Sequence, residues 1–145
     1  MSNVQIRPLN PLEFLVTNLR IPYTMKTTSI QKALPIVKPW CVTKEKINLA
    51  TQRLIVAANP VCVILFGSQA RGNANPESDA DFLVIEKRVE NRFSELARLR
   101  HCLKGLLLSA DILVIDQDGF MRLRDDPGSV YHHAYQEGRC LYGSI

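Results

Sequence analysis

A regular pattern of apolar and polar positions begins at Thr43, and it first predicts a helix. Apolar residues recur between 47 and 58 with a period near 3.6, and Asn59-Pro60 ends the pattern. Thr43 is placed to cap this helix, with Lys46 at the position where a capping box usually has Glu. The helix is therefore expected to begin just after Thr43.

The same period predicts two further helices, over residues 90–104 and 129–137. Gly105 and Gly138 follow them, at positions where glycine commonly ends a helix. The residues expected to face inward on the helix over 90–104 are Phe93, Leu96, Ala97, Leu99 and Leu103. Its arginines are expected to form a solvated face, because they lie on the other side.

Three short apolar runs, 61–66, 81–85 and 111–115, predict strands between these helices. The runs are rich in branched side chains, and the continuous run 61–66 is typical of a strand buried on both faces. Residues 140–142 are expected to add a short last strand, whereas Gln117-Asp118-Gly119 has the composition of a turn. The pattern predicts a small α/β (α+β) domain, a short mixed sheet flanked by helices.

Composition places the chain in the globular class. Its 145 residues suffice for one domain, and 46% of them are hydrophobic. No apolar run approaches the roughly 18 residues of a membrane span, and the start lacks a secretory signal pattern. The four scattered cysteines indicate reduced thiols. These features favour a cytoplasmic protein without a membrane segment.

Charge and proline content separate residues 1–40 from residues 41–145. The first segment has five basic residues, one acidic residue and five of the eight prolines, whereas the second has 13 basic and 13 acidic residues. Residues 1–40 are interpreted as a loosely ordered extension, and Met25 leaves open that translation starts there. Because the second segment is balanced, direct nucleic-acid binding is not expected.

The candidate chemistry lies between residues 67 and 81. Gly67-Ser68 follows a buried strand and leads into a short helix, where free N–H groups and a hydroxyl can hold phosphate oxygens. Taken alone, this dipeptide is more often a plain turn. Asp79 and Asp81 are two residues apart at the entry to a strand, so both carboxylates face one side of the sheet. Such like charges raise each other's pKa unless a cation such as Mg²⁺ neutralises them; a solvated turn is the alternative.

Asp111 is the third candidate carboxylate, because it opens a strand of branched apolar residues and needs a partner or a metal. If its strand lies beside residues 81–85, Asp111 faces the other two acids and the three can surround one or two metal ions. Asp116 and Asp118 are rival candidates, but Asp111 is preferred because they follow the strand. The neighbouring His132 and His133 point about 100° apart on a helix, which favours packing or surface roles.

The combination of Gly67-Ser68, Asp79-x-Asp81 and a later strand bearing Asp111 resembles the polymerase-beta-type nucleotidyltransferase superfamily. The string from Gly67 to Gly72, followed by Ser78 to Val84, is similar to its minimal nucleotidyltransferases, which are often encoded beside a HEPN-domain partner. The resemblance covers about residues 43–145. It implies a small polymerase-beta-type fold.

For this sequence, the resemblance implies that Gly67 and Ser68 bind the phosphates of ATP and that Asp79, Asp81 and Asp111 hold two Mg²⁺ ions. Asp111 would also help remove the proton of the attacking hydroxyl, and Arg71 would neutralise phosphate charge or else pair with a nearby acid. The acceptor would be a tyrosine of a HEPN ribonuclease toxin, which receives AMP and is inactivated. Two other hypotheses remain open: transfer to a small molecule of the aminoglycoside type, and toxin binding without catalysis.

Overall fold

The computed structural model describes residues 38–75 and 77–145, which lie in one compact unit, Val37–Ile145. The extension predicted over residues 1–40 falls outside the described residues except for its last three positions. The elements in chain order are α3 (Lys44–Ala58), β1 (Cys62–Phe66), α4 (Gly67–Arg71), β2 (Ala80–Glu86), α5 (Arg92–Cys102), β3 (Ala110–Asp116), α6 (Gln117–Leu123), α7 (Val130–Glu137) and β4 (Arg139–Gly143). None of the helices described in these ranges is long and apolar enough to cross a bilayer.

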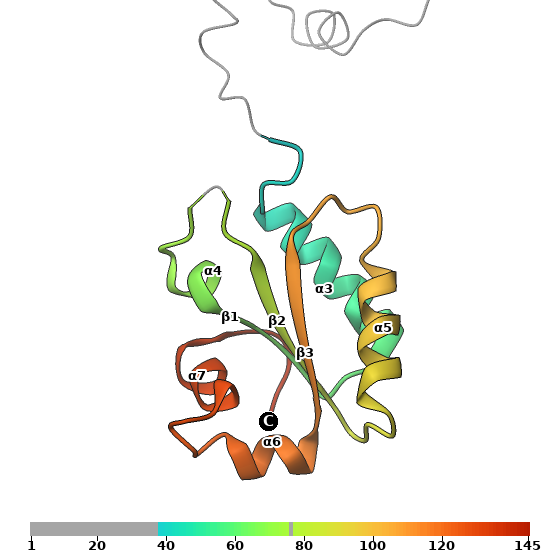
Figure 1. The fold of residues 1–145 in the computed structure, drawn as a ribbon, viewed down its shortest axis with the longest axis vertical. Helices are drawn as coiled ribbons and strands as arrows, with labels where there is room; N and C mark the ends of the chain where they lie inside the picture. Colours follow the sequence, from blue (N-terminus) through green and yellow to red (C-terminus); the bar gives the residue numbers. More distant parts are fainter. Residues whose placement is uncertain (1–37, 76) are drawn as a thin grey trace, which may run out of the picture. The chain divides into compact units, whose positions relative to one another are not determined.

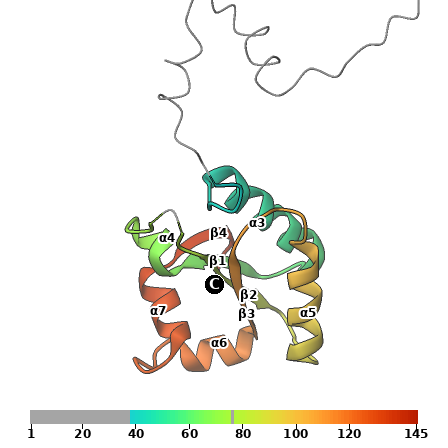
Figure 2. The ribbon, with the colours of Figure 1, turned by 45° about the horizontal axis from the view of Figure 1, so that its top comes forward.

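The four strands form one mixed sheet in the order β3-β2-β1-β4. Figure 1 labels β1, β2 and β3, and Figure 2 also labels β4. β2 runs parallel to β3, whereas β1 is antiparallel to both β2 and β4. Helices α3 and α5 lie on one side of this sheet, and α4, α6 and α7 lie on the other (Figures 1 and 2). The arrangement confirms the small α+β fold with a short mixed sheet.

Two apolar clusters, one on each face, hold the sheet between these helices. Phe82 and Val84 of β2 pack with Leu54 of α3 and Leu99 of α5. The alternate residues of β2 contribute to the other cluster, which contains Phe120 of α6. Since both faces are covered, β2 is apolar at almost every position, as expected for a strand buried on both sides.

Lys46 explains how the chain enters α3. Thr43 caps the helix, because its side-chain oxygen accepts from the N–H of Lys46 at 3.3 Å. The Lys46 ammonium donates to the carbonyl oxygens of Pro39, Cys41 and Leu107, the last two at 3.0 and 2.8 Å. Lysine therefore replaces the acid of a capping box because its three donors join the entry segment to the loop before β3.

The predicted inward position of Phe93 is wrong: its side chain is 86% exposed. Asn91 caps α5 by accepting from the N–H groups of Phe93 and Ser94, so Phe93 lies in the first turn. Val89, in the loop before the helix, packs against the core instead, and Leu99 is the buried residue of α5. Ala97, also predicted to face inward, is exposed as well, so the buried face of α5 is narrower than predicted.

The turn predicted at Gln117-Asp118-Gly119 is a helix, α6. Asp116 caps it, since its carboxylate accepts from the Gly119 N–H at 2.7 Å. Aspartate and glycine are common both in turns and at the start of a helix, so the sequence does not distinguish a turn from a helix there. The predicted helix over 129–137 is confirmed as α7, with Ser129 as its cap.

Candidate active site at the start of the parallel strands

The site lies at the end of the sheet where β1 stops and both parallel strands begin. Phe66, the last residue of β1, is opposite Asp81 in the antiparallel pair. Asp81 is in turn opposite Asp111 in the parallel pair of β2 and β3. The register therefore brings together Asp81 of β2, Asp111 of β3 and Gly67, the first residue after β1. It confirms the strand neighbours on which the predicted role of Asp111 depends.

Gly67 is required at the junction of β1 and α4 by both conformation and space. Its φ is +68°, in the left-handed region that favours glycine. A Cβ atom built on Gly67 would lie 2.2 Å from Oδ2 of Asp81 and 3.1 Å from its Cγ. The backbone at Gly67 thus forms a wall beside the Asp81 carboxylate. Any side chain at position 67 would displace that carboxylate.

Three carboxylates share the electrostatics of this end of the sheet. Burial raises the pKa of Asp81, and the negative charges of Asp111 and Asp79 raise it further, while Arg71 opposes the rise. Asp81 is half-buried, whereas Asp79 and Asp111 are exposed. The cluster of acids that the sequence predicts is therefore present, and its negative charge is only partly compensated.

These acids fit a metal ion that has further ligands from a substrate. Among residues 38–75 and 77–145, no three His, Cys, Asp or Glu side chains form a group that could hold a metal on their own. Magnesium commonly takes one or two carboxylates and completes its shell with substrate phosphates and water. The hard oxygen donors of Asp79, Asp81 and Asp111 suit such a shared site.

Arg71 forms an ion pair, one of the two roles left open for it. It ends α4, and its Nη1 lies 3.0 Å from Oε2 of Glu137 at the end of α7. Both side chains are nearly half exposed, so the pair can exchange with another anion at little cost. Figure 2 shows α4 and α7 side by side, which explains the contact. Sequence analysis had not assigned a role to Glu137.

The whole described domain matches one known family. Residues 45–144 match the family model described as "Polymerase beta, Nucleotidyltransferase". The chain belongs to this family. No protein with curated information matched it.

Two solved structures are similar to the nucleotidyltransferase domain. A Sulfolobus solfataricus protein assigned as a nucleotidyltransferase is 19% identical, with a TM-score of 0.50 over 68% of this chain and 78% of that one. A toxin-antitoxin structure with AMP-PNP is 20% identical, with a TM-score of 0.44 over 67% of this chain and 73% of that one. At this identity, the first likeness supports the fold.

Gln69 and Ser78 position the loop that leads to the aspartates of the nucleotidyltransferase domain. Gln69 Nε2 donates to the Ser78 carbonyl at 3.2 Å. Ser78 Oγ accepts from the Asn75 N–H at 2.9 Å, and the Ser78 N–H donates to the Asn75 carbonyl at 3.0 Å. These contacts join α4 to the residue just before Asp79. The only sequence signal for them is the polar, turn-rich composition of the loop.

The rival candidates of the sequence analysis lie elsewhere in the nucleotidyltransferase domain. Asp116 caps α6 at the opposite end of β3, and Asp118 belongs to that helix. The rings of His132 and His133 lie 5.8 Å apart, and Nδ1 of His132 is 2.7 Å from the Arg124 carbonyl oxygen. These positions agree with the preference for Asp111 and with a packing role for His132.

Proposed function

We propose that this chain transfers AMP from ATP to a hydroxyl group of a protein. The observation that carries the proposal is the Asp81 carboxylate held against the Gly67 backbone, beside Asp111 in register. Family membership supports nucleotidyl transfer as the reaction class. The resemblance of residues 67–84 to minimal nucleotidyltransferases supports a tyrosine of a HEPN toxin as acceptor and an antitoxin as the role.

The phosphates of ATP would lie along the start of α4. Gly67 presents backbone without a side chain there, and the side chain of Phe66, at the N-cap position, makes no capping hydrogen bond to α4. The Ser68 hydroxyl would donate to a phosphate oxygen, and Arg71 would exchange its pair with Glu137 for phosphate charge. These residues orient the triphosphate so that its α-phosphorus faces the acids.

Asp79, Asp81 and Asp111 would hold the Mg²⁺ ions that accompany ATP. Bound Mg²⁺ supplies charge stabilisation for the triphosphate and lowers the pKa of a hydroxyl. The acceptor oxygen attacks the α-phosphorus, the bond to the β-phosphate breaks, and pyrophosphate leaves. The Asp111 carboxylate, which is exposed at the edge strand, takes the proton of the acceptor hydroxyl.

Intact-protein mass spectrometry tests the proposal. A HEPN partner is incubated with this chain, ATP and Mg²⁺, and the control is the double variant Asp79→Asn with Asp81→Asn. Mass additions of AMP units that disappear with the variant would support the proposal. A partner that is bound and silenced without a mass change would replace transfer with simple binding. A partner that is neither bound nor modified would exclude the antitoxin role and direct the search to small-molecule acceptors.

A further inference from the structure

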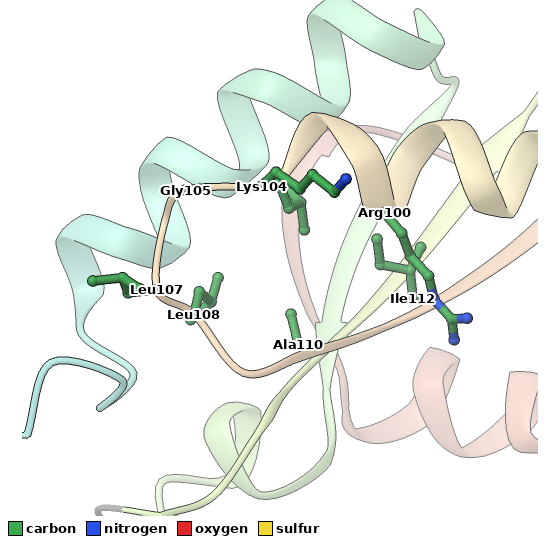
Figure 3. Close-up of a pocket in the computed structure, with 8 residues that line it drawn as sticks. Arg100, Lys104, Gly105, Leu107, Leu108, Ala110 and Ile112 are labelled. Atoms are coloured by element: carbon green, nitrogen blue, oxygen red, sulfur yellow. The ribbon is translucent and has the colours of Figure 1, made fainter.

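A cavity of about 340 Å³ lies between the C-terminal end of α5 and the start of β3. Its lining is aliphatic with two cations, and it includes Arg100, Leu103, Lys104, Leu107, Leu108 and Ile112. Figure 3 shows Arg100 reaching from α5 past Ile112, with Leu107 and Leu108 on the connecting loop. Ala110 and Ile112 line the cavity on either side of Asp111 along the strand.

Leu107 is held in this wall in an unfavourable conformation. Its φ is +47°, in the left-handed region, and its side chain is 64% exposed. The Lys46 ammonium fixes this loop by donating to the Leu107 carbonyl at 2.8 Å and to two carbonyls of the segment before α3. Strained backbone that displays an apolar side chain to solvent is a feature of ligand-binding surfaces.

The two cations of the cavity give it a positive charge without internal compensation. Arg100 in α5 and Lys104 in the turn after it are both exposed, and both line the cavity. Neither takes part in an ion pair with another residue of the described ranges. Arg71 and Arg98, by contrast, pair with Glu137 and Glu95. The cavity therefore favours an anionic partner.

Strand β3, beside the cavity, also has backbone groups that can bind a partner. Within the described sheet β3 is an edge strand, because only β2 pairs with it. Its outer N–H and C=O groups can pair with an extended segment of another chain. Asp111 faces the opposite side of the sheet from Ile112, but on an edge strand both sides are reached from the same segment.

We propose that this cavity docks an extended, acidic and aliphatic segment of the acceptor protein, which lies along β3 and presents its hydroxyl to Asp111. The inference rests on the proposed function, whose acceptor it describes. Aliphatic walls and an open strand edge suit a polypeptide. The lining contains no aromatic side chain on which a nucleic-acid base could stack, so a polypeptide is favoured over a single strand of RNA.

Two synthetic peptides test the inference with the full chain. Each contains one tyrosine among leucines, with glutamates in the first peptide and lysines in the second. The acidic peptide is expected to bind about tenfold more tightly in fluorescence anisotropy, the effect of two exposed ion pairs. Arg100→Glu with Lys104→Glu should reverse this preference. Lys87→Glu with Arg88→Glu, at the far end of β2, changes the net charge equally and should leave it unchanged.

Transfer to the same peptides, with ATP and Mg²⁺, separates docking from chemistry. The charge reversal should raise the KM for the acidic peptide about tenfold and leave kcat nearly unchanged. If the acidic peptide bound, the charge reversal abolished its binding and no transfer occurred, the result would support docking in the cavity and contradict the proposed function. Equal affinity of the two peptides, or a preference that the charge reversal does not alter, would overturn the docking proposal and leave the proposed function standing.

A second variant and a second probe guard against misfolding and against another partner. Leu107→Ser removes the exposed apolar side chain without adding charge, and it should weaken acidic-peptide binding severalfold while thermal melting shows a folded protein. The second probe is a labelled single-stranded RNA. If it bound more tightly than the acidic peptide, and if the charge reversal abolished its binding, the inference would be overturned in favour of nucleic acid.

Discussion

The parallel pair of β2 and β3 has two acidic residues opposite each other at both of its ends. Asp81 is opposite Asp111 where the strands begin, and Glu86 is opposite Asp116 where they end. The two pairs belong to the same ladder, separated by the buried residues 82–85. Only the first pair has the surroundings of a reactive site, so position on the sheet alone does not make acids functional.

At the far end, one acid caps a helix and the other is buried. Asp116 caps α6 through the N–H of Gly119. Glu86 is only 8% exposed, and burial together with a hydrogen bond to Glu95 raises its pKa to about 7. Its Oε1 has no hydrogen-bond partner among the described residues. A carboxyl group in these surroundings is favoured in its neutral form.

At the near end, the acids remain available. Asp79 and Asp111 are exposed, and the Asp81 carboxylate lies against backbone that carries no side chain. Among the described residues, Arg71 is the cation that opposes the rise in the pKa of Asp81, and it is shared with Glu137. Such a cluster gains most from a bound cation, so the two acidic pairs of one ladder differ in their surroundings, and the proposed chemistry belongs to the near end.

The largest expected effect separates the two ends by charge removal. Asp81→Asn should reduce nucleotidyl transfer by about 10³-fold or more, because it removes a ligand and a negative charge at the reacting phosphate. Asp116→Asn is the matched control: it removes the acid at the other end but keeps a good helix cap. Rates of pyrophosphate release measure both. Equal losses in the two variants would contradict the assignment of the site.

The next expected effect tests the wall that Gly67 forms. Gly67→Ala should reduce transfer by about 10²-fold, because the added Cβ displaces the Asp81 carboxylate. Gly72→Ala is the control, since Gly72 also has a left-handed φ, +76°, but nothing lies within 4 Å of its added Cβ. Both variants carry backbone strain, so thermal melting should shift similarly. If Gly72→Ala reduced activity as much, strain alone would explain the loss.

Local signals in the sequence were sufficient for most of the fold and for placing the candidate acids at one end of the sheet. The cap at Thr43, the apolar runs and the glycine after β1 act over a few residues, and each is confirmed. Phe93 was assigned wrongly because Val89, outside the helical period, fills the core at that end. Helix α6 was missed because Asp116 as a cap has the composition of a turn.

Contacts between distant residues could not be predicted in the same way. The pair of Arg71 and Glu137 depends on α7 returning beside α4, which no local pattern indicates. Lys46 also binds the carbonyl of Leu107, which lies 61 residues away in the loop before β3. The register of Asp81 with Asp111 was expected only on condition that their strands were neighbours. Long-range packing, not residue type, decided all three.

A smaller effect concerns the pH dependence of stability at the far end. The pKa of Glu86 is raised from 4.5 in the unfolded chain to about 7, so its neutral form favours folding. That stability is fully present below about pH 4.5 and is lost as the pH rises through 7. Glu86→Gln should therefore raise the free energy of unfolding at pH 8 by about 1–2 kcal/mol, and by little at pH 4.5.

Urea denaturation at several pH values measures this difference between Glu86→Gln and the unmodified protein. Because Asp81 is present in both, its own raised pKa cancels in the comparison. Glu90→Gln, an exposed change of the same kind, is the control and should give no pH-dependent difference. A difference at pH 4.5 as large as that at pH 8 would show that packing, not ionisation, is responsible.

The smallest expected effect tests whether Asp116 acts only as a cap. Asp116→Ala should lower the free energy of unfolding by about 1 kcal/mol, because the Gly119 N–H loses its acceptor. Asp116→Asn should restore most of that stability, since an amide oxygen caps as well as a carboxylate oxygen. Urea denaturation measures the stability of both, and pyrophosphate release should be unchanged in either variant. If Asp116→Asn also lowered transfer, the charge at this end would matter to the reaction, and the two acid pairs of the ladder would be functionally coupled through β3.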